Sequence, residues 1–425
     1  MTKLFARFML LIAALGIATP TWGAPQQATP ASSFHDSICV VIQPAFVAEA
    51  EWNNNLWPGF LADLGVKNVR GKLSTNLTAV SRLKPYFASG GKMIVTVVAQ
   101  SGSVDKVKTK KNLLFLAANV PSANLVGLES ANELNHNYSA TDTARILRDL
   151  QPFLRSTVSA IPQLAKVPLV APSIYIRDPA VYKAVGNLEP NVDRWNLHYY
   201  NEGRRPPITG GLTKPGTLAQ AILDARILAP TKPGYITEMG YKQATPDASP
   251  AAGVLSERAA AIYSLRAYLD YYAAGVEKSC IYSLIDDAAR GKINHGLRMT
   301  AAQGFKPRAN FHAIKNLTAL FADPGVGSGS LDYSLAGAPA SLRKQLFVKS
   351  DGTFLLTMYQ DVDSWNRSTK RDTVVAPANV TITLPASASF QVYRPTFGAA
   401  AVQTANGNRI VVPVADDAVV LAVRP

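Results

Sequence analysis

The chain has 425 residues, a formal net charge of +14 and 48% hydrophobic residues. This length allows one large catalytic domain and a smaller companion domain. The basic excess favours polyanions, but the Lys and Arg residues are scattered and no zinc-finger spacing, phosphate loop or RNA-binding signature accompanies them. We therefore expect no nucleic-acid partner. The two cysteines, Cys39 and Cys280, are too few for a cysteine-based metal site.

The N-terminus has the pattern of a secretory signal peptide. Lys3 and Arg7 precede an apolar run from Phe8 to Ala18, which a helix break and small residues follow. This run is shorter than the roughly 20 apolar residues of a transmembrane helix. We predict a cleaved signal peptide over residues 1–23, a flexible leader over residues 24–33, and a secreted or periplasmic protein without stable membrane insertion. An uncleaved interfacial anchor is the alternative.

Short apolar runs alternate with amphipathic helical stretches between residues 34 and 325, which is the pattern of repeated βα units. The expected helices include residues 143–161, 218–228 and 255–274. Eight parallel strands separated by helices predict an α/β fold, a (β/α)8 TIM barrel with its active site at the carboxyl ends of the strands. The expected strands cover residues 38–42, 66–70, 93–99, 125–129, 167–172, 194–198, 235–238 and 279–285.

Cys39 and Cys280 lie early in the first and the eighth of these strands, which are neighbours in a closed barrel. An oxidising compartment would allow a disulfide across this closure seam. Two buried, reduced thiols are the alternative, because a cross-strand disulfide requires a narrow geometry. The sequence alone leaves both possibilities open.

The pattern changes at about residue 326. Residues 307–322 are expected to form a last helix, and short β-patterned runs separated by Gly, Asp, Asn and Pro turns follow it. We predict that residues 326–425 form a small antiparallel β-sandwich, which either binds sugar or covers barrel helices and stabilises the fold. The expected strands cover residues 345–349, 353–359, 380–384, 390–393 and 409–414.

Two glutamates lie at the ends of expected barrel strands. Glu133 follows the fourth strand, and Glu238 ends the seventh. Cleavage of a glycosidic bond needs two such carboxyl groups, one protonated to assist the leaving oxygen and one ionised to attack or stabilise the sugar cation. We therefore interpret the chain first as a glycoside hydrolase with a carbohydrate substrate, which requires no metal and no organic cofactor.

The order and spacing of these segments resemble clan A retaining glycoside hydrolases, in particular family 39 and its relatives, which combine a barrel with a trailing β-sandwich. Glu129-Ser-Ala-Asn132-Glu133 is similar to the Glu-x-x-Asn-Glu motif on strand four of that family. The resemblance implies that Glu133 is the general acid/base, that Glu238 is the nucleophile, and that Asn132 binds the sugar 2-hydroxyl. Glu133 is then expected to have a raised pKa, because of partial burial and the neighbouring negative charge.

Further positions follow the pattern of this family. Arg70 is similar to the strand-two arginine that pairs with the nucleophile and keeps it ionised. His198 and Tyr200 resemble the strand-six residues that line the cleavage subsite. Two positions depart from the pattern, because Ala131 and Tyr282 stand where tryptophan is common. Tyr282 is still expected to bind substrate, but the identity of the sugar cannot be inherited across this change.

Two other pairs of residues each allow two interpretations. Trp52 and Trp57 follow the first strand and either stack on sugar rings or anchor the first helix. Asp286 and Asp287 follow the eighth strand and either bind sugar hydroxyls or fix Arg290 and its loop. The residue types alone do not decide between these roles.

The substrate is the least determined part of the interpretation. Arg204 and Arg205 lie in the segment 201–214, which is expected at the barrel mouth, and either contact an acidic sugar or remain solvated. We hypothesise an extracellular polysaccharide, with acidic groups as a refinement, and leave endo or exo action and the oligomeric state open. A catalytically silent carbohydrate-binding protein and an envelope or matrix protein are the alternatives.

Overall fold

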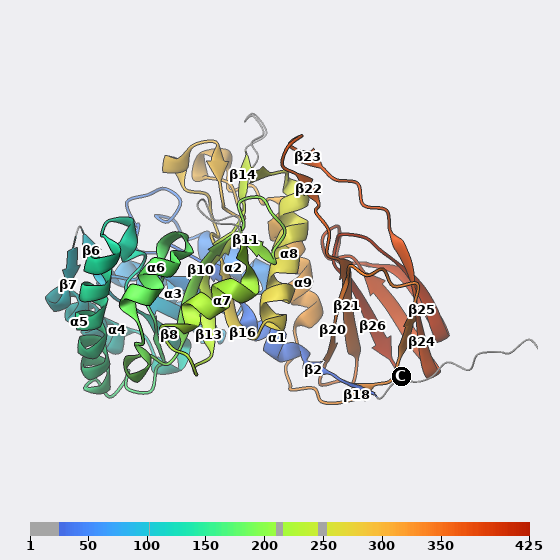
Figure 1. The fold of residues 1–425 in the computed structure, drawn as a ribbon, viewed down its shortest axis with the longest axis horizontal. Coiled ribbons are helices and arrows are strands. Elements are labelled where there is room, and N and C mark those ends of the chain that lie inside the picture. Colours follow the sequence, from blue (N-terminus) through green and yellow to red (C-terminus); the bar gives the residue numbers. More distant parts are fainter. Residues whose placement is uncertain (1–24, 102, 210–215, 245–252) are drawn as a thin grey trace, which may run out of the picture.

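The computed structural model describes residues 25–101, 103–209, 216–244 and 253–425 (Figure 1). The predicted signal peptide lies outside the described residues, as do residues 210–214 of the predicted mouth segment. In the described part of the chain, no helix has both the length and the apolar character needed to cross a membrane.

Eight parallel strands form the central sheet, in the order β10-β13-β16-β3-β4-β5-β8-β9. One parallel bridge between Val170 and Arg194 connects the two end strands, so the sheet closes almost completely into a barrel. The eight predicted strands and the α/β barrel are therefore confirmed, with strand ends shifted by a few residues. The strands are β3 (Ile38–Val41), β4 (Asn68–Gly71), β5 (Lys92–Thr96), β8 (Leu125–Glu129), β9 (Leu169–Val170), β10 (Trp195–Tyr200), β13 (Gly234–Gly240) and β16 (Val276–Ile281).

Side chains on each barrel strand alternate between the barrel interior and the surrounding helices. On β3, Ile38 and Val40 join the large core under the helices, whereas Cys39 and Val41 lie in a separate cluster inside the barrel with Ile94. The lower and middle barrel is therefore filled by side chains. At the carboxyl ends of the strands the inward positions become polar, and the candidate site is built there.

Helices form a layer around the barrel (Figure 1). In the longest of them, α5, the Ser139 hydroxyl accepts a hydrogen bond from the Asp142 N–H at the N-terminus, and Leu147, Leu150 and Leu154 are buried on one face. The helices are α1 (Ala31–Ser37), α2 (Trp57–Leu64), α3 (Leu77–Ala88), α4 (Lys106–Asn119), α5 (Ala140–Ser159), α6 (Pro179–Val185), α7 (Leu218–Arg226), α8 (Glu257–Ala273) and α9 (Ala309–Phe321). Short strands in the connecting loops are β6 (Ala99–Ser101), β7 (Ser103–Asp105), β11 (Ile208–Thr209), β12 (Gly216–Thr217), β14 (Lys242–Ala244), β15 (Val254–Leu255) and β17 (Ile293–Asn294).

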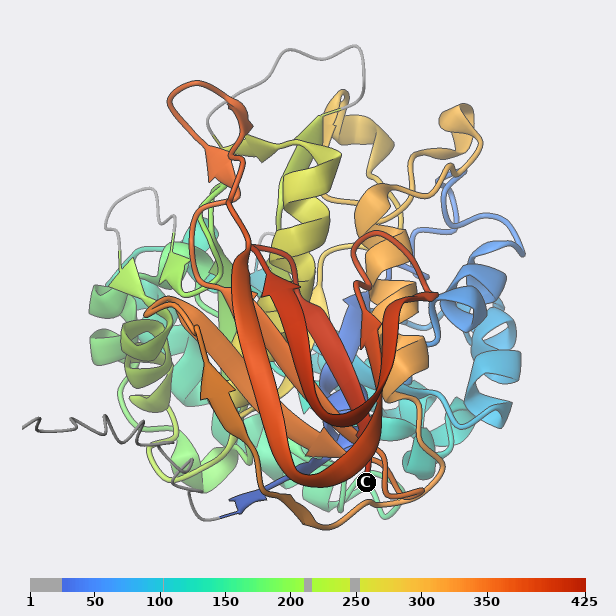
Figure 2. The same ribbon diagram turned by 90° about the vertical axis from the view of Figure 1, so that its right-hand side faces the viewer.

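The predicted β-sandwich is not confirmed, because the C-terminal strands join one seven-stranded sheet (Figure 2). The first half of β24 pairs with β19 and its second half with β26, while β25 pairs along both halves. β24 thus unites two runs predicted as separate strands, and β26 was not predicted. The seven-stranded sheet consists of β19 (Ser334–Ala336), β20 (Leu342–Val348), β21 (Phe354–Gln360), β24 (Ala378–Tyr393), β25 (Ala401–Val414), β26 (Val419–Arg424) and the N-terminal β2 (Thr29–Pro30). Three short C-terminal strands pair outside this sheet, namely β18 (Ser330–Leu331), β22 (Trp365–Asn366) and β23 (Arg371–Asp372).

The structure corrects the prediction of a flexible leader over residues 24–33. From residue 25 onward this segment is part of the fold: β1 (Gln26–Gln27) pairs with β18, and β2 (Thr29–Pro30) pairs with β20 at the edge of the C-terminal sheet. Helix α1 then begins at Ala31. Strands of two residues have no periodicity, so the composition of Pro, Gln, Ala and Ser suggested a leader instead.

The C-terminal sheet packs against α8 and α9 on one side of the barrel. Phe347 of β20 contacts the rings of Phe34 and Phe321, at centroid distances of 5.2 and 5.1 Å. Close by, the carboxylate of Asp361 accepts a hydrogen bond of 2.8 Å from Arg266, whose side chain is fully buried in α8. Both contacts attach the C-terminal domain to helices of the barrel, as expected for a domain that covers these helices.

Cys39 and Cys280 form a disulfide in the structure and are aligned with each other on the adjacent strands β3 and β16. Of the two possibilities that the sequence leaves open, the structure contains the disulfide. The bond crosses the seam between the first and the eighth barrel strand. It lies in the barrel interior, below the polar residues of the candidate site.

We predict that the disulfide stabilises the barrel strongly. The cysteines are 241 residues apart, and closing a loop of this length in the unfolded chain corresponds to about 5 kcal/mol in the chain-entropy treatment. Urea denaturation of the oxidised and the reduced protein should therefore show a loss of several kcal/mol on reduction. Mass spectrometry of the non-reduced protein provides the control, and two thiols open to alkylation would contradict the prediction.

Candidate active site

Two adjoining cavities lie at the carboxyl ends of the barrel strands, with volumes of about 340 and 300 Å³. They share Asn132, Glu238 and Tyr282 in their walls. Every residue that the sequence predicted for the site lines at least one of them. These residues are Arg70, Asn132, Glu133, His198, Tyr200, Glu238 and Tyr282.

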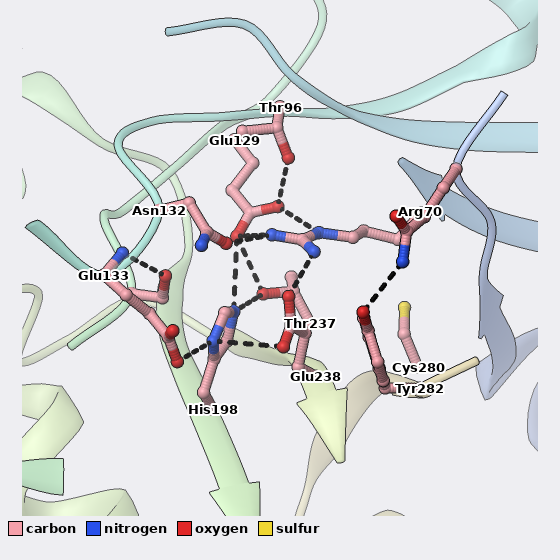
Figure 3. Close-up of polar contacts among 12 residues, drawn as sticks. Arg70, Thr96, Glu129, Asn132, Glu133, His198, Thr237, Glu238, Cys280 and Tyr282 are labelled. Atoms are coloured by element: carbon pink, nitrogen blue, oxygen red, sulfur yellow. Dashed lines mark hydrogen bonds and ion pairs between the residues drawn. The ribbon is translucent and has the colours of Figure 1, made fainter. Parts of the chain in front are cut away.

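Glu238 is oriented by one hydrogen bond to each carboxylate oxygen. Arg70 Nη1 donates to Oε1 at 2.5 Å, and the Tyr200 hydroxyl donates to Oε2 at 2.8 Å. The predicted pairing of Arg70 with Glu238 is therefore present (Figure 3). Arg70 also donates to the side-chain oxygen of Asn132 at 2.6 Å, which orients the amide toward the same cavities.

Glu129 is a functional residue to which sequence reasoning gave no role. Its carboxylate is fully buried and accepts two hydrogen bonds from Arg70, of 2.7 and 3.0 Å (Figure 3). Thr96, Asn196 and Thr237 also donate to it. Burial raises the pKa of Glu129, but the charges of Arg70 and His198 and the hydrogen bonds of these two side chains outweigh burial and hold the pKa well below its usual range.

His198 connects the two predicted catalytic glutamates. Its Nδ1 lies 2.7 Å from Glu133 Oε1 and 3.6 Å from Glu238 Oε2, and its Nε2 lies 3.1 Å from the Thr237 hydroxyl. Burial lowers the pKa of His198, but the carboxylates of Glu238 and Glu133 outweigh burial and raise it to about 10. His198 is therefore an imidazolium that donates to Glu133 and to Thr237.

The expectation of a raised pKa for Glu133 is wrong. Burial raises the pKa of Glu133, but the positive charge and the hydrogen bond of His198 lower it further than burial raises it. The sequence suggested that His198 lines the subsite, but not that it hydrogen-bonds Glu133. Because the pKa of His198 is raised and that of Glu133 is lowered, the proton of this pair belongs to His198, whose Nδ1 is 2.7 Å from Glu133 Oε1.

The backbone turns Glu133 toward the cavity. Glu133 has φ 49° and ψ 46°, in the left-handed region that costs most residues energy. The Glu133 N–H lies 3.2 Å from both the carbonyl oxygen and the hydroxyl oxygen of Ser173, a residue that follows β9. These hydrogen bonds offset the energetic cost of the left-handed backbone. The segments that follow β8 and β9 are thus joined where Glu133 leaves the barrel.

The separation of the carboxyl groups fits a retaining mechanism. One oxygen of Glu133, one oxygen of Glu238 and one ring nitrogen of His198 all lie within 4.8 Å of one another. Retaining glycosidases have carboxyl groups about 5 Å apart, whereas inverting enzymes need about 6.5 Å or more to admit a water molecule. The same three groups could bind a metal ion only if His198 lost its proton, because a metal requires a neutral imidazole.

The structure decides between the two roles considered for the paired tryptophans and the paired aspartates. Trp52 and Trp57 are buried and pack edge to face, so they anchor the start of α2. Asp286 is buried and accepts a hydrogen bond from Arg308, and Asp287 pairs with Arg290 at 3.2 Å. The aspartates therefore fix loops.

Arg204 and Arg205 do not reach the cavities that contain the glutamates. Arg205 pairs with Asp361 at 2.7 Å and so connects the barrel to the C-terminal domain. Arg204 lines a separate hollow beside residues 362–375. In the described part of the predicted mouth segment, residues 201–209, Glu202 lines the larger cavity, but the sequence did not show which way Arg204 and Arg205 point.

Several further residues line the larger cavity and were not predicted. Tyr175, Ile176 and Arg177 come from the turn after β9, and Lys242 and His295 come from short strands and loops at the mouth. Positions on irregular loops follow no period, so nothing in the sequence marks them as inward-facing.

We predict that the His198–Glu133 pair makes stability depend on pH. The folded-state pKa of His198 is about 10, above the ordinary value of 6.5, so its stabilisation is complete below pH 6.5 and is lost as the pH rises through 10. The difference in free energy of unfolding between wild type and His198→Asn should therefore shrink from pH 6.5 to 10 in urea titrations. A difference that stays constant over this range would show that His198 is neutral in the folded protein.

Comparison with known proteins finds similarity in structure but not in sequence. No model of a protein family matches the chain, and no curated protein sequence matches it. Among solved structures, a GH39 β-xylosidase from Caulobacter crescentus is similar at a TM-score of 0.58 and 14% identity, over 94% of this chain and 98% of that one. A glucosidase from Croceicoccus marinus is similar at a TM-score of 0.61 and 10% identity, over 95% and 98% of the chains. An endo-β1,6-glucanase is similar at a TM-score of 0.55 and 10% identity, over 94% and 92%. The chain therefore has the fold of these glycoside hydrolases over nearly its whole length.

Proposed function

We propose that this protein is a retaining glycoside hydrolase, with Glu238 as nucleophile and Glu133 as general acid/base. The observation that carries the proposal is the approach of one oxygen of each carboxyl group to within 4.8 Å of the other in a cavity at the carboxyl ends of β8 and β13. The fold of the neighbouring glycosidases supports it, because the same barrel end holds active sites generally.

The first step of the proposed mechanism forms a covalent glycosyl-enzyme. Glu238, oriented by Arg70 and Tyr200, attacks the anomeric carbon while the bond to the leaving oxygen breaks. The leaving oxygen takes a proton from Glu133. That proton comes from His198 Nδ1, which is 2.7 Å from Glu133 Oε1. Binding of a sugar over Glu133 removes water from the carboxylate, which favours transfer of the proton to it.

The second step releases the sugar. Glu133, now ionised, takes a proton from a water molecule, whose oxygen attacks the anomeric carbon and frees Glu238. The proton can return to His198, which restores the starting state. The hydrogen bond from Asn132 to the sugar 2-hydroxyl, implied by the resemblance, would strengthen as positive charge develops on the ring.

We further propose that the protein is exported and that it cleaves β-glycosidic bonds in an extracellular polysaccharide or oligosaccharide. The N-terminal signal-peptide pattern supports export, and a disulfide across the barrel seam is compatible with an oxidising compartment. A panel of bacterial exopolysaccharides and plant β-glycans, with analysis of the products, would identify the substrate.

The roles of the glutamates make different predictions for two kinds of substrate. Glu238→Gln should abolish turnover of all substrates. Glu133→Ala should lower the rate of oligosaccharide hydrolysis by about 100- to 10,000-fold. The rate of the glycosylation step with 2,4-dinitrophenyl β-glycosides should fall much less, because a good leaving group needs little proton donation. Steady-state kinetics on β-glucosides, β-xylosides and β-glucuronides would test this.

Glu277→Gln is a suitable control for these variants. Glu277 is an exposed glutamate at the start of β16, at the opposite end of the barrel. The Glu277→Gln variant should retain wild-type kinetics on every substrate. Equal losses for Glu133→Ala on activated and unactivated substrates would contradict its role as general acid.

A further inference from the structure

One corner of the larger cavity carries two basic side chains that the proposed mechanism does not use. Lys242 of β14 and Arg290 of the loop after β16 both line this cavity, together with Tyr282 and His295. Arg290 lies 5.6 Å above the ring of Tyr282, which is 5.8 Å from the ring of His295. We call these four residues the basic corner.

The basic corner is close to the proposed nucleophile. Tyr200, which donates its hydroxyl hydrogen bond to Glu238, has its ring 5.6 Å from that of His295. Tyr282 lines both cavities beside Glu238. A sugar whose anomeric carbon faces Glu238 would therefore reach the basic corner with substituents on the same ring.

The charges of Lys242 and Arg290 are not needed to balance the catalytic glutamates. Glu238 is paired with Arg70, and Glu133 is paired with His198. Within the described residues, Lys242 is paired with Glu202 and Arg290 with Asp287. A ligand carboxylate that competes with Glu202 and Asp287 for these two cations would therefore leave the hydrogen bonds of the mechanism intact.

These two ion pairs are longer and more exposed than the ion pair between Arg308 and Asp286. Lys242 Nζ is 3.7 Å from Glu202 and Arg290 Nε is 3.2 Å from Asp287, with 41% and 46% of the basic side chains exposed. By contrast, Arg308 lies 2.6 Å from Asp286 and is fully buried. Charge-assisted bonds are normally 2.7–2.9 Å long, so both partners in the corner are weakly held.

His295 adds a buried polar group without a protein partner. It is 7% exposed, and its Nδ1 has no hydrogen bond within the described residues. Burial, together with the charges of Arg290 and Lys242, lowers the pKa of His295 to about 3. The ring is therefore neutral, and the positive charge of the corner comes from the lysine and the arginine.

We propose that the basic corner binds the carboxylate of a uronic acid unit whose anomeric carbon faces Glu238, so that the substrate is an acidic β-glycan. The planar guanidinium of Arg290 suits a carboxylate, and Lys242 adds a second charge-assisted hydrogen bond. This inference rests on the proposed function for the orientation of the sugar. It replaces Arg204 and Arg205 as the basis for an acidic substrate, because those residues point elsewhere.

The test measures binding, so that it does not depend on turnover. The probes are a β-linked oligosaccharide of alternating glucuronic acid and glucose, and the same oligosaccharide with its carboxyl groups reduced to alcohols. Calorimetry with Glu238→Gln as the background variant should show at least about tenfold tighter binding of the acidic form. Adding Arg290→Ala or Lys242→Ala should weaken binding of the acidic form by about tenfold and leave binding of the reduced form unchanged.

Arg145→Ala is the matched control. Arg145 is an exposed arginine that pairs with Asp142 three residues away, as Arg290 pairs with Asp287, but it lies on the outer helix α5. This variant should bind both forms like the background variant. Equal binding of the two forms, equal effects of Arg290→Ala on both, or binding of neither form would overturn the proposal.

Kinetics of the wild-type protein, without Glu238→Gln, distinguish a failure of this inference from a failure of the proposed function. Hydrolysis of the reduced oligosaccharide as fast as the acidic one would overturn the acidic-substrate inference and leave the glycosidase standing. Selective binding of the acidic form without hydrolysis of either form would support the basic corner and contradict the proposed function.

Discussion

The active end of this barrel depends on one buried guanidinium. Arg70 makes two hydrogen bonds to Glu129, one to Glu238 and one to Asn132. Two carboxylates in a nearly dry site would repel each other without it, and breaking a buried ion pair typically costs about 3–5 kcal/mol. Glu129 therefore matters although it lines neither of the two cavities, because it holds Arg70 in the position from which Arg70 reaches Glu238.

A second charged pair gives the other glutamate a different environment. His198 is protonated between the carboxylates and donates to Glu133, so the pair stores a proton near the position where the leaving oxygen would lie. Glu238, by contrast, is bound by Arg70 and by the neutral Tyr200. The two carboxyl groups thus differ in their partners rather than in burial alone, and this difference supports different chemical roles.

Much of this arrangement could be predicted from the sequence, and the failures have physical causes. Barrel strands are short apolar runs with regular spacing, so the barrel could be predicted. Glu133 follows β8 and Glu238 lies near the end of β13, so both could be placed at the carboxyl end of the barrel. β26 was missed although it is an apolar run, whereas the two-residue strands near Thr29 have no detectable pattern. The contact of His198 with Glu133, and the direction in which Arg205 points, arise only when distant segments meet.

The stereochemistry of hydrolysis tests the retaining mechanism most directly, because the separation of the two carboxyl groups determines it. Proton NMR during hydrolysis of a β-glycoside identifies the anomer that forms first, before mutarotation. A separation within 4.8 Å predicts that the first product is the β-anomer, since two displacements restore the configuration. Initial release of the α-anomer would contradict a covalent intermediate on Glu238 and the roles proposed for both glutamates.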